Sequence, residues 1–576
     1  MPMRALVLVL VVLPAAVQAA PRWVRLGFSD PDVTTRFTVS WNTEGADEPT
    51  QVEVGKGVTY ALQFQGQAKQ LPGGLGWLHE VELTGLAPDS QYHYRVGGPG
   101  AWSDDFVFRT LPADPCAPIK LVFLGDGRSD DDAGSSPRWP GIVDEALSYG
   151  PALALHSGDI VKDGAEWPQW QNHLEQTAPY SPRLPIGYTQ GNHDDDSVEG
   201  DGALYNQVFA HPRNTKSGTE DYYFLRFGDV IVVGLSTQTY QGGAYAFEEQ
   251  ATWLDQVLTA NPARWKIVFF HHPAFTASLD IGFADVGHPP NENNQNPALL
   301  PVFDKHHVDL VFAGHNHFYE RFKPMRQSGG DPAKGDVVGD PSQGTIHVVT
   351  GGAGAFTYVV GMAILCGLTP GNENCNGNHH FVLLGIEGDT LTYTARQTKE
   401  QILGASASNA VVIDTFTVTK PGGTVCATGP EPQPEAEADA SSPSEPAPEV
   451  VGDAAPDSGP AEVAGDTAAA CVNNAQCAGR VAPGACPGYP ACEAGACVWR
   501  CTPGEPDAQV SDAKHPGDAP SEAEAADTAI PAGTLERDDG KGSGSSCGIG
   551  SSARGVPLVA ALAVALLALT RRRRAR

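Results

Sequence analysis

The chain has 576 residues, a length that indicates several modules rather than one ordinary domain. Its formal net charge is -31 at pH 7, and 11 of its residues are cysteines. Much of this negative charge lies in residues 421–470, which contain no Lys or Arg. Nucleic-acid-binding surfaces are basic, and no such surface is evident in the sequence.

Residues 1–19 have the pattern of a secretory signal peptide. An early arginine precedes an apolar run from Ala5 to Val12, and the small residues Val17 and Ala19 lie at a plausible cleavage point. The cysteine content agrees with export, because disulfides persist in oxidising compartments. We therefore expect a secreted protein; a buried first helix is the alternative.

Residues 22–112 are predicted to form an all-β domain. The stretch 83–96, "LTGLAPDSQYHYRV", resembles the strand corner of fibronectin type III domains, in which a tyrosine, here Tyr92, bonds back to the preceding turn. Such sandwiches are mostly structural or binding modules, so no activity follows from this domain alone. Segments that alternate apolar and polar residues between Gly, Pro and Asp turns lie at 36–43, 50–57, 77–86, 90–98 and 104–110.

Residues 117–420 alternate short apolar strands with helical segments, which favours a layered α/β architecture. Ligands of open α/β sheets bind outside the carboxyl ends of the strands, and nearly all of the early strands end in metal-competent polar residues. We expect strands within 119–126, 152–159, 229–237, 265–273, 308–317, 345–352, 379–396 and 411–420.

Carboxylates, one amide and several imidazoles follow these strands. A mixed set of oxygen and nitrogen ligands suits Mn, Fe or Zn better than Ca or Mg, and it lacks the thiolates of a structural zinc site. Taken singly, each residue could be a helix cap, a turn or a buried histidine. Together they predict a binuclear site in which a carboxylate such as Asp159 bridges two cations. The residues are Asp126, Asp159, Asn192, His193, His271, His315 and His317.

The blocks "GDG", "GDIV", "GNHD", "FFHHPAF" and "HVDLVFAGHNHFYER" resemble those of purple-acid-phosphatase-type metallophosphoesterases, within the calcineurin-like phosphoesterase superfamily. The resemblance implies a four-layer αββα sandwich behind a fibronectin III-like domain. It implies two metal ions of Fe, Mn or Zn and a metal-bound hydroxide as the nucleophile. His193 would face the phosphate as the catalytic residue. The first metal would be held by Asp126, Asp159 and His317, and the second by Asp159, Asn192, His271 and His315.

Two positions depart from the family pattern. The family usually offers a further first-metal ligand two places after the first Asp or three places after the second, where this chain has Arg128 and Lys162. Neither is a ligand while protonated, so the first position would be open, weak or completed by water. Both side chains could bind the substrate phosphate, or they could pair with carboxylates such as Asp130 or Asp163.

The expected function is a secreted, surface-attached hydrolase of small phosphoesters, similar to acid phosphatases. The family histidine lies two places before a proline, which assigns the metal to His271, because Pro273 fixes that register. His272 is then either a supporting residue or a substrate-binding one. A phosphodiesterase on the same metal core and an inactive surface binding protein are the alternatives. The oligomeric state is not indicated.

Residues 421–470 contain no Lys or Arg and are predicted to be a disordered acidic spacer. Six cysteines in 471–501 predict a disulfide microdomain, because so small a segment cannot bury enough core to fold alone. A zinc module is the rival, but paired C-x-x-C units and histidines are missing there. A second disordered linker is expected at 502–546.

Residues 547–576 resemble the MYXO-CTERM type of surface-sorting signal. Cys547 precedes a hydrophobic segment, residues 556–570, and a block of arginines. The resemblance implies processing there and attachment to the cell surface; a plain C-terminal membrane anchor is the alternative. The remaining cysteines could form one or two bridges, with Cys366 and Cys375 the closest pair in sequence.

Overall fold

The computed structural model describes most of the chain up to residue 426. The described residues are 20–45, 49–196, 198, 203–238, 246–278, 287–358, 366–399, 411–420, 422 and 426, with the backbone alone of 240–241, 244–245, 488–493 and 496–501. The predictions of a signal peptide at 1–19, a linker at 502–546 and a sorting tail at 547–576 lie outside these residues. So do most of the spacer at 421–470 and the side chains of the cysteine-rich segment at 471–501.

The N-terminal domain is a sandwich of two four-stranded sheets, which confirms the predicted all-β domain. Every segment expected there contains a strand, and the Tyr92 hydroxyl accepts the Ala87 N–H at 2.8 Å, as expected of the tyrosine corner. One sheet has the order β1 (Arg22–Gly27), β2 (Phe37–Thr43), β6 (Trp77–Leu83) and β5 (Gln67–Gln70). The other has the order β4 (Leu62–Gln65), β3 (Gln51–Gly55), β7 (Gln91–Gly97) and β8 (Phe106–Arg109).

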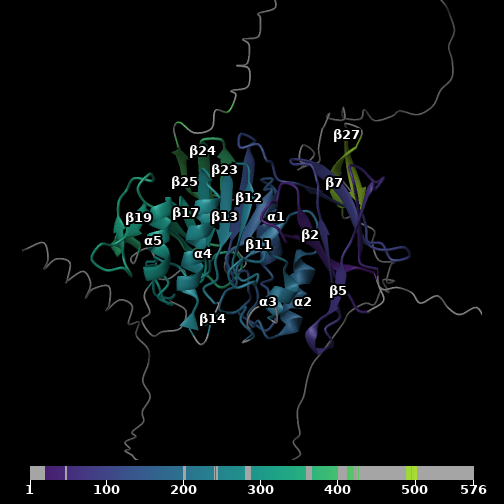
Figure 1. The fold of residues 1–576 in the computed structure, drawn as a ribbon, viewed down its shortest axis with the longest axis horizontal. Helices are drawn as coiled ribbons and strands as arrows, with labels where there is room; N and C mark the ends of the chain where they lie inside the picture. The colour runs from purple at the N-terminus through teal and green to yellow at the C-terminus, as the bar shows by residue number, and fades with distance from the viewer. Residues whose placement is uncertain are drawn as a thin grey trace, which may run out of the picture. The chain divides into compact units, whose positions relative to one another are not determined.

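The following domain contains two larger sheets, labelled in part in Figure 1. The six-stranded sheet has the order β11 (Ile186–Tyr188), β10 (Leu153–His156), β9 (Ile119–Leu124), β23 (His380–Glu387), β24 (Thr390–Gln397) and β25 (Val412–Thr419). The seven-stranded sheet has the order β12 (Tyr223–Phe227), β13 (Val230–Gly234), β16 (Trp265–Phe269), β17 (Leu310–Ala313), β21 (Ile346–Thr350), β18 (Tyr319–Phe322) and β22 (Asn372–Asn376).

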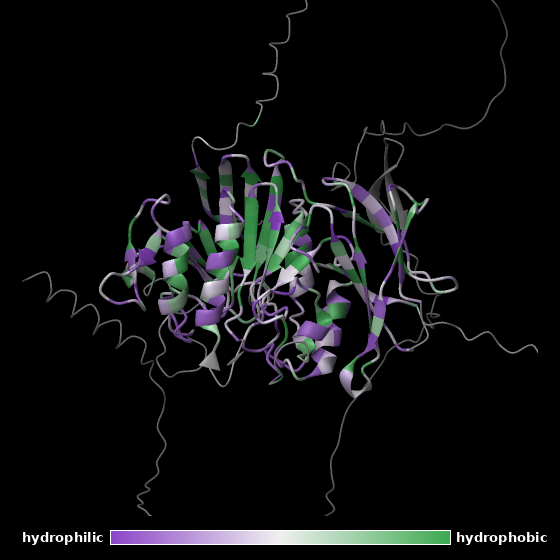
Figure 2. Cartoon of the chain, in the orientation of Figure 1, coloured by the Kyte–Doolittle hydropathy of each residue, from purple (hydrophilic) through white to green (hydrophobic). Residues whose placement is uncertain are grey.

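The two sheets pack face to face between helices, which confirms the αββα architecture. In β9, Leu121 and Phe123 point into the core shared with the other sheet, whereas Val122 and Leu124 pack with Trp139 of α1. Figure 2 shows the central strands largely in the green of hydrophobic residues, as expected of strands buried on both faces. The helices are α1 (Trp139–Leu147), α2 (Trp167–Thr177), α3 (Leu204–Val208), α4 (Phe247–Ala260) and α5 (Asn296–His306).

Parallel pairing brings the metal-competent loops to one place. In the six-stranded sheet β9, β10 and β11 are parallel, and in the seven-stranded sheet β13, β16, β17 and β21 are parallel. The carboxyl ends of each parallel group therefore lie at one edge of its sheet. A bond from the His315 N–H to Asp126 Oδ1, 2.9 Å long, joins the two edges.

The N-terminal domain is bonded to the second domain through its first strand and the loop after it. The Leu26 N–H donates to the Ser181 carbonyl at 3.0 Å, and the Phe28 N–H donates to the Ala210 carbonyl at 3.0 Å. The Arg226 N–H donates back to the Pro31 carbonyl at 2.7 Å. These backbone bonds fix one domain against the other.

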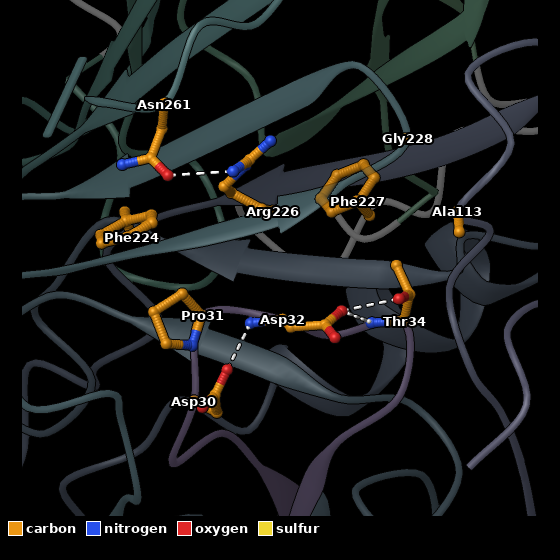
Figure 3. Close-up of a pocket in the computed structure, with 10 residues that line it drawn as sticks. All are labelled: Asp30, Pro31, Asp32, Thr34, Ala113, Phe224, Arg226, Phe227, Gly228 and Asn261. Carbon is orange, nitrogen blue, oxygen red and sulfur yellow. Dashed lines mark hydrogen bonds between the residues drawn. The ribbon is translucent and has the colours of Figure 1, made fainter. Parts of the chain in front are cut away.

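A cavity of about 340 Å³ lies beside this junction (Figure 3). Its polar groups bond to one another: Asp32 Oδ1 accepts the Thr34 N–H at 3.0 Å, and Arg226 Nη1 donates to Asn261 Oδ1 at 2.9 Å. No candidate metal ligand lines it. We therefore assign the cavity to the junction rather than to the metal centre.

Two disulfides are formed among the described residues. Cys116 bonds to Cys426 and Cys366 bonds to Cys375, which agrees with the expected one or two bridges and includes the pair closest in sequence. Short hairpins join β14 (Tyr240–Gln241) to β15 (Ala244–Tyr245), β19 (Met325–Gln327) to β20 (Gly335–Val337), and β26 (Gly488–Glu493) to β27 (Ala496–Cys501). In the part of the chain that the structure describes, no helix is both long and apolar enough to cross a membrane.

Candidate metal centre

The loops that follow the strands turn in a conformation that most residues avoid. Asp126, Asp159 and His315 have φ angles of 59°, 57° and 69°, in the left-handed region. Such strain costs roughly 1–3 kcal/mol per residue and persists where the surroundings impose it, often at functional sites. Three of the predicted metal-site residues share this feature.

Glycines beside these residues allow the loops to approach one another. A Cβ on Gly191 would lie 2.2 Å from Asp159 Oδ1, and one on Gly314 would lie 2.4 Å from Asp126 Oδ2. Neither distance leaves room for a side chain. The recurrent pattern of a glycine before the polar residue therefore has a packing cause.

The four residues predicted for the second metal converge around one imidazole nitrogen. His271 Nε2 lies 3.0 Å from Asn192 Oδ1, 3.2 Å from Asp159 Oδ1 and 3.2 Å from His315 Nδ1. His271 and His315 are buried, whereas Asn192 is exposed. This side of the centre is therefore open to solvent at Asn192.

The residues predicted for the first metal lie next to this group. His317 Nε2 is 3.5 Å from Asp126 Oδ1. Ligand atoms of Asp126, Asp159 and His271 all lie within 4.8 Å of one another, which links the two positions through Asp159. The structure thus brings together all six predicted ligands.

Hydrogen bonds on the outer side of each ring determine which nitrogen is available. His271 Nδ1 lies 2.9 Å from the Ser157 carbonyl, and His317 Nδ1 lies 2.8 Å from the Phe356 carbonyl. A carbonyl only accepts hydrogen bonds, so each Nδ1 carries a proton and each neutral ring turns an Nε2 lone pair toward the carboxylates.

His315 is held in the opposite sense. Its Nε2 lies 2.8 Å from the Glu292 carboxylate, which leaves the Nδ1 lone pair pointing at His271 Nε2. Two lone pairs that face each other at 3.2 Å repel, so either a proton on His271 Nε2 or a metal ion must lie between them. Metal-binding histidines characteristically donate their other N–H to a carboxylate or a carbonyl, so this donor set fits a metal centre.

The electrostatics also favour a cation here. Burial by itself lowers the pKa of the His271 imidazole, but the neighbouring Asp159 and Asp126 carboxylates outweigh it and raise that pKa to about 9. The carboxylates that would attract a proton to this ring also attract a metal ion.

Asp194 joins two of the loops. Its buried carboxylate accepts the N–H groups of Asp159 and Gly191 at 2.8 Å each. It accepts those of Ile160 and Val161 as well, at 2.8 and 3.1 Å. Burial and the Asp159 charge raise its pKa to about 7 despite these donors. Asp194 therefore positions the loop that carries Asp159.

His193 lies on the accessible side of the centre. Its N–H donates to Asp159 Oδ1 at 3.0 Å, and its ring Nδ1 lies 2.7 Å from the Lys162 carbonyl. The ring is half-buried, and the carbonyl fixes the proton on Nδ1. Nε2 is then the nitrogen that can exchange a proton with a substrate.

His272 lies behind the centre. It is buried, its Nδ1 is 2.8 Å from the Thr237 hydroxyl, and its ring centroid is 4.2 Å from that of His315. This placement favours the supporting alternative over the substrate-binding one. His272, Glu292 and His315 also form a separate group of close potential ligands, in which His315 is one of the residues predicted for the second metal.

Arg128 and Lys162 both pair with carboxylates. Arg128 Nε lies 3.3 Å from Asp159 Oδ2, and Arg128 Nη1 lies 3.2 Å from Asp130 Oδ1. Lys162 Nζ lies 2.9 Å from Asp132 rather than reaching Asp163. Sequence reasoning missed Asp132 and Glu292, because no motif marks a residue that acts only through a neighbour.

Two family models match the chain. The model of the purple acid phosphatase N-terminal domain matches residues 21–110, and that of the calcineurin-like phosphoesterases matches residues 119–319. The second match contains every predicted ligand and His193.

Relatives and solved structures agree with these matches. An uncharacterised protein of Mycobacterium tuberculosis is 29% identical over 372 residues, covering 56% of this chain and 68% of the relative. Acid phosphatase type 7 of Homo sapiens is 26% identical over 376 residues, covering 61% and 81%. The structure of a purple acid phosphatase from yellow lupin (Lupinus luteus) seeds is similar in fold, with a TM-score of 0.55, 19% identity and coverage of 71% and 78%.

Proposed function

We propose that this chain, which joins the N-terminal domain of the purple acid phosphatases to a calcineurin-like phosphoesterase domain, hydrolyses phosphoesters at a binuclear metal centre. The observation that carries the proposal is the orientation of three imidazoles. His271, His315 and His317 each bond outward to a fixed acceptor. The other ring nitrogen faces Asp159 in His271, Asp126 in His317 and His271 Nε2 in His315.

The residues of the chain have distinct tasks in this proposal. Two bound metal ions supply Lewis acidity, which activates water and neutralises charge on the phosphate. Asp159 would serve both metal positions, because its Oδ1 faces His271 and its Oδ2 faces Arg128. His193, with its Nδ1 proton held by the Lys162 carbonyl, would donate a proton from Nε2 toward the leaving oxygen when the ring is doubly protonated, and would be left as the neutral imidazole. Asn192 lies at the exposed side, where a substrate enters.

Within this class we propose an acid-phosphatase-like hydrolase of small phosphomonoesters. Relatives named as acid phosphatases support this choice. A phosphodiesterase on the same core and an inactive binding protein are the alternatives; the pairing of Arg128 with Asp159 is the observation that favours the inactive protein.

We further propose that the protein is exported and attached to the cell surface. The support is the signal-peptide pattern of 1–19, the sorting-signal pattern of 547–576 and the two disulfides, which form in oxidising compartments. Mass spectrometry of the mature chain tests this proposal. It predicts loss of residues 1–19 and processing near Cys547; an intact N-terminus with an unmodified tail contradicts it.

The function is tested on purified protein with p-nitrophenyl phosphate and bis-p-nitrophenyl phosphate, before and after chelation. We expect monoester hydrolysis that EDTA abolishes and divalent metal restores. Asn192→Ala should remove activity, whereas Asn261→Ala, at the cavity of Figure 3, should retain it. Preference for the diester supports the phosphodiesterase, metal binding without turnover supports the binding protein, and activity that survives EDTA contradicts the proposal.

A further inference from the structure

Arg128 is the most enclosed cation at the centre. Its side chain is 12% exposed, and it lies in the loop after β9, two residues beyond Asp126. Its backbone N–H donates to the Asp159 carbonyl at 3.0 Å, and an isolated bridge pairs it with Ser135. The backbone therefore fixes where the guanidinium can lie.

One edge of the guanidinium faces atoms that the first metal needs. Nε lies 3.3 Å from Asp159 Oδ2, and Nη2 lies 3.5 Å from His317 Nε2. Because His317 Nδ1 holds its proton for the Phe356 carbonyl, Nε2 presents its lone pair to this edge. The same lone pair and the same carboxylate oxygen would coordinate the first metal.

The opposite edge of the Arg128 guanidinium is held by hydrogen bonds. Nη1 lies 3.2 Å from Asp130 Oδ1 and 3.3 Å from the Ser129 carbonyl. Asp130 in turn accepts the Phe356 N–H at 3.1 Å. The loop of Phe356, whose carbonyl bonds to His317, and the loop that contains Arg128 are thus joined beside the guanidinium.

A metal at this position meets two obstacles. Metal–nitrogen and metal–oxygen bonds are about 2.0–2.2 Å long, so the ion must displace the N–H groups that Arg128 directs at Asp159 and His317. A guanidinium stays protonated, so it opposes the ion with a like charge and cannot become a ligand. The second position uses Asp159 Oδ1, on the side of His271 and away from the Oδ2 that Arg128 contacts.

We infer that Arg128 competes with the first metal ion, so that the two positions fill in a fixed order: Asn192, His271 and His315 first, and the Asp126–His317 side only when the guanidinium is displaced. The inference rests on the proposed metal centre and adds an unequal affinity to it. A hydrogen bond to a charged group corresponds to about tenfold or more in an equilibrium constant, so we expect at least about a tenfold difference between the positions.

The test is a titration of the metal-stripped full chain with Mn²⁺, with free Mn²⁺ followed by electron paramagnetic resonance and bound heat by calorimetry. We expect two classes of site in the wild type. In Arg128→Ala the weaker class of site should bind Mn²⁺ with higher affinity, because the guanidinium that competes with the ion is absent. In Arg128→His, where a neutral imidazole replaces the guanidinium, the two classes should differ by about threefold or less. Lys162→Ala, which removes a cation paired with the exposed Asp132, should leave both classes unchanged.

Two equal sites in the wild type overturn the inference and leave the proposed function intact. Unequal sites that persist in folded Arg128→Ala and Arg128→His overturn it as well, with circular dichroism melting as the check on folding. A wild-type chain that binds no Mn²⁺ overturns both the inference and the proposed centre. If the wild type has two sites of unequal metal affinity and Arg128→His makes the two affinities similar, the inference is supported. This holds even when the chain hydrolyses no tested ester.

Discussion

At the scale of single residues, Glu292 shows how a side chain acts through a neighbour. Its carboxylate lies 2.8 Å from His315 Nε2 and 3.4 Å from His288 Nδ1. These contacts fix the tautomer that points His315 Nδ1 at His271. Glu292 is exposed, so it can be replaced without opening the core.

We predict that Glu292→Ala lowers metal affinity about 10- to 100-fold, the usual effect of removing such a partner. Metal content after dialysis against graded chelator measures the change. Glu248→Ala, on the exposed first turn of α4, is the matched control. Equal metal retention by the two variants would count against a positioning role for Glu292.

His79 makes the N-terminal domain sensitive to acid. It is fully buried between the hydroxyls of Thr43 and Thr50, at 2.8 and 2.7 Å, and stacks on Trp41. Burial lowers its pKa from 6.5 to about 4. The folded state therefore binds fewer protons than the unfolded state between these pH values, and stability that is full above pH 6.5 is lost as the pH falls toward 4.

We predict that His79→Gln reduces the loss of unfolding free energy between pH 7 and pH 4 by about 3 kcal/mol. Urea denaturation at both pH values, followed by tryptophan fluorescence, measures the difference. An unchanged pH dependence would show that His79 titrates normally in the folded protein.

The candidate metal ligands at the strand ends could be predicted from the sequence, because only a few side chains, mainly Asp, Asn and His here, can bind such metals. The partners of Arg128 and Lys162 could not be chosen, because spacing along the chain does not decide between two nearby carboxylates. Asp130 was among the expected partners, but Asp132 was not. Side-chain direction in the folded loop makes that choice.

At the scale of elements, the centre depends on how closely loops from two sheets approach. Gly314 directly follows β17, and a Cβ there would lie 2.4 Å from Asp126 Oδ2 and 2.9 Å from Ser157 Oγ. Both atoms belong to the other sheet's loops. The glycine thus sets the separation between the sheet edges.

We predict that Gly314→Ala lowers metal affinity by at least about tenfold, because the carboxylate of Asp126 must move from its position. Calorimetric metal titration measures the effect. In Gly329→Ala an added Cβ meets nothing within 4 Å, so that variant should bind metal as the wild type does. Wild-type affinity in Gly314→Ala would mean that the loops adjust freely.

Strands that are buried and apolar were predictable, since their composition alone separates them from helices and turns. The strand β22, with the sequence "NENCN", was not, because it is polar and forms only by pairing with β18. β11 has three residues and β18 follows the histidine motif directly, so neither has a pattern of its own. Tertiary pairing supplies what their sequences lack.

At the scale of the whole molecule, the disulfide between Cys116 and Cys426 links the start of the α/β domain to the chain beyond the last strand of that domain. It closes a loop with a sequence separation of 310, whereas Cys366 and Cys375 are separated by 9. A longer loop restricts the unfolded chain more strongly. The first bridge should therefore stabilise the fold more than the second.

We predict that Cys116→Ser with Cys426→Ser lowers the unfolding free energy by about 5–6 kcal/mol, and that the double change at Cys366 and Cys375 lowers it by about 2–3 kcal/mol. Guanidinium denaturation under non-reducing conditions compares them. A larger loss from the short loop would show that local strain or packing, rather than chain entropy, dominates.

The all-β domain followed by the α/β domain could be predicted, because the strand pattern changes after Pro115. The junction between the first two domains could not, since it is made of backbone bonds such as Arg226 to Pro31, which no side-chain pattern records. The architecture of the metal centre depends on both the strand order and the loops. The strand order brings the loops together, and the loops orient the candidate ligands.

Anomalous diffraction from crystals of the protein soaked in Mn²⁺ or Zn²⁺ tests the metal centre most directly. The account predicts an anomalous peak about 2.0–2.2 Å from Asp159 Oδ1 and His271 Nε2, with a weaker second peak on the side of Asp126 and His317 that gains occupancy at higher metal concentration. Crystals that diffract well and show no peak within bonding distance of Asp159 would contradict it.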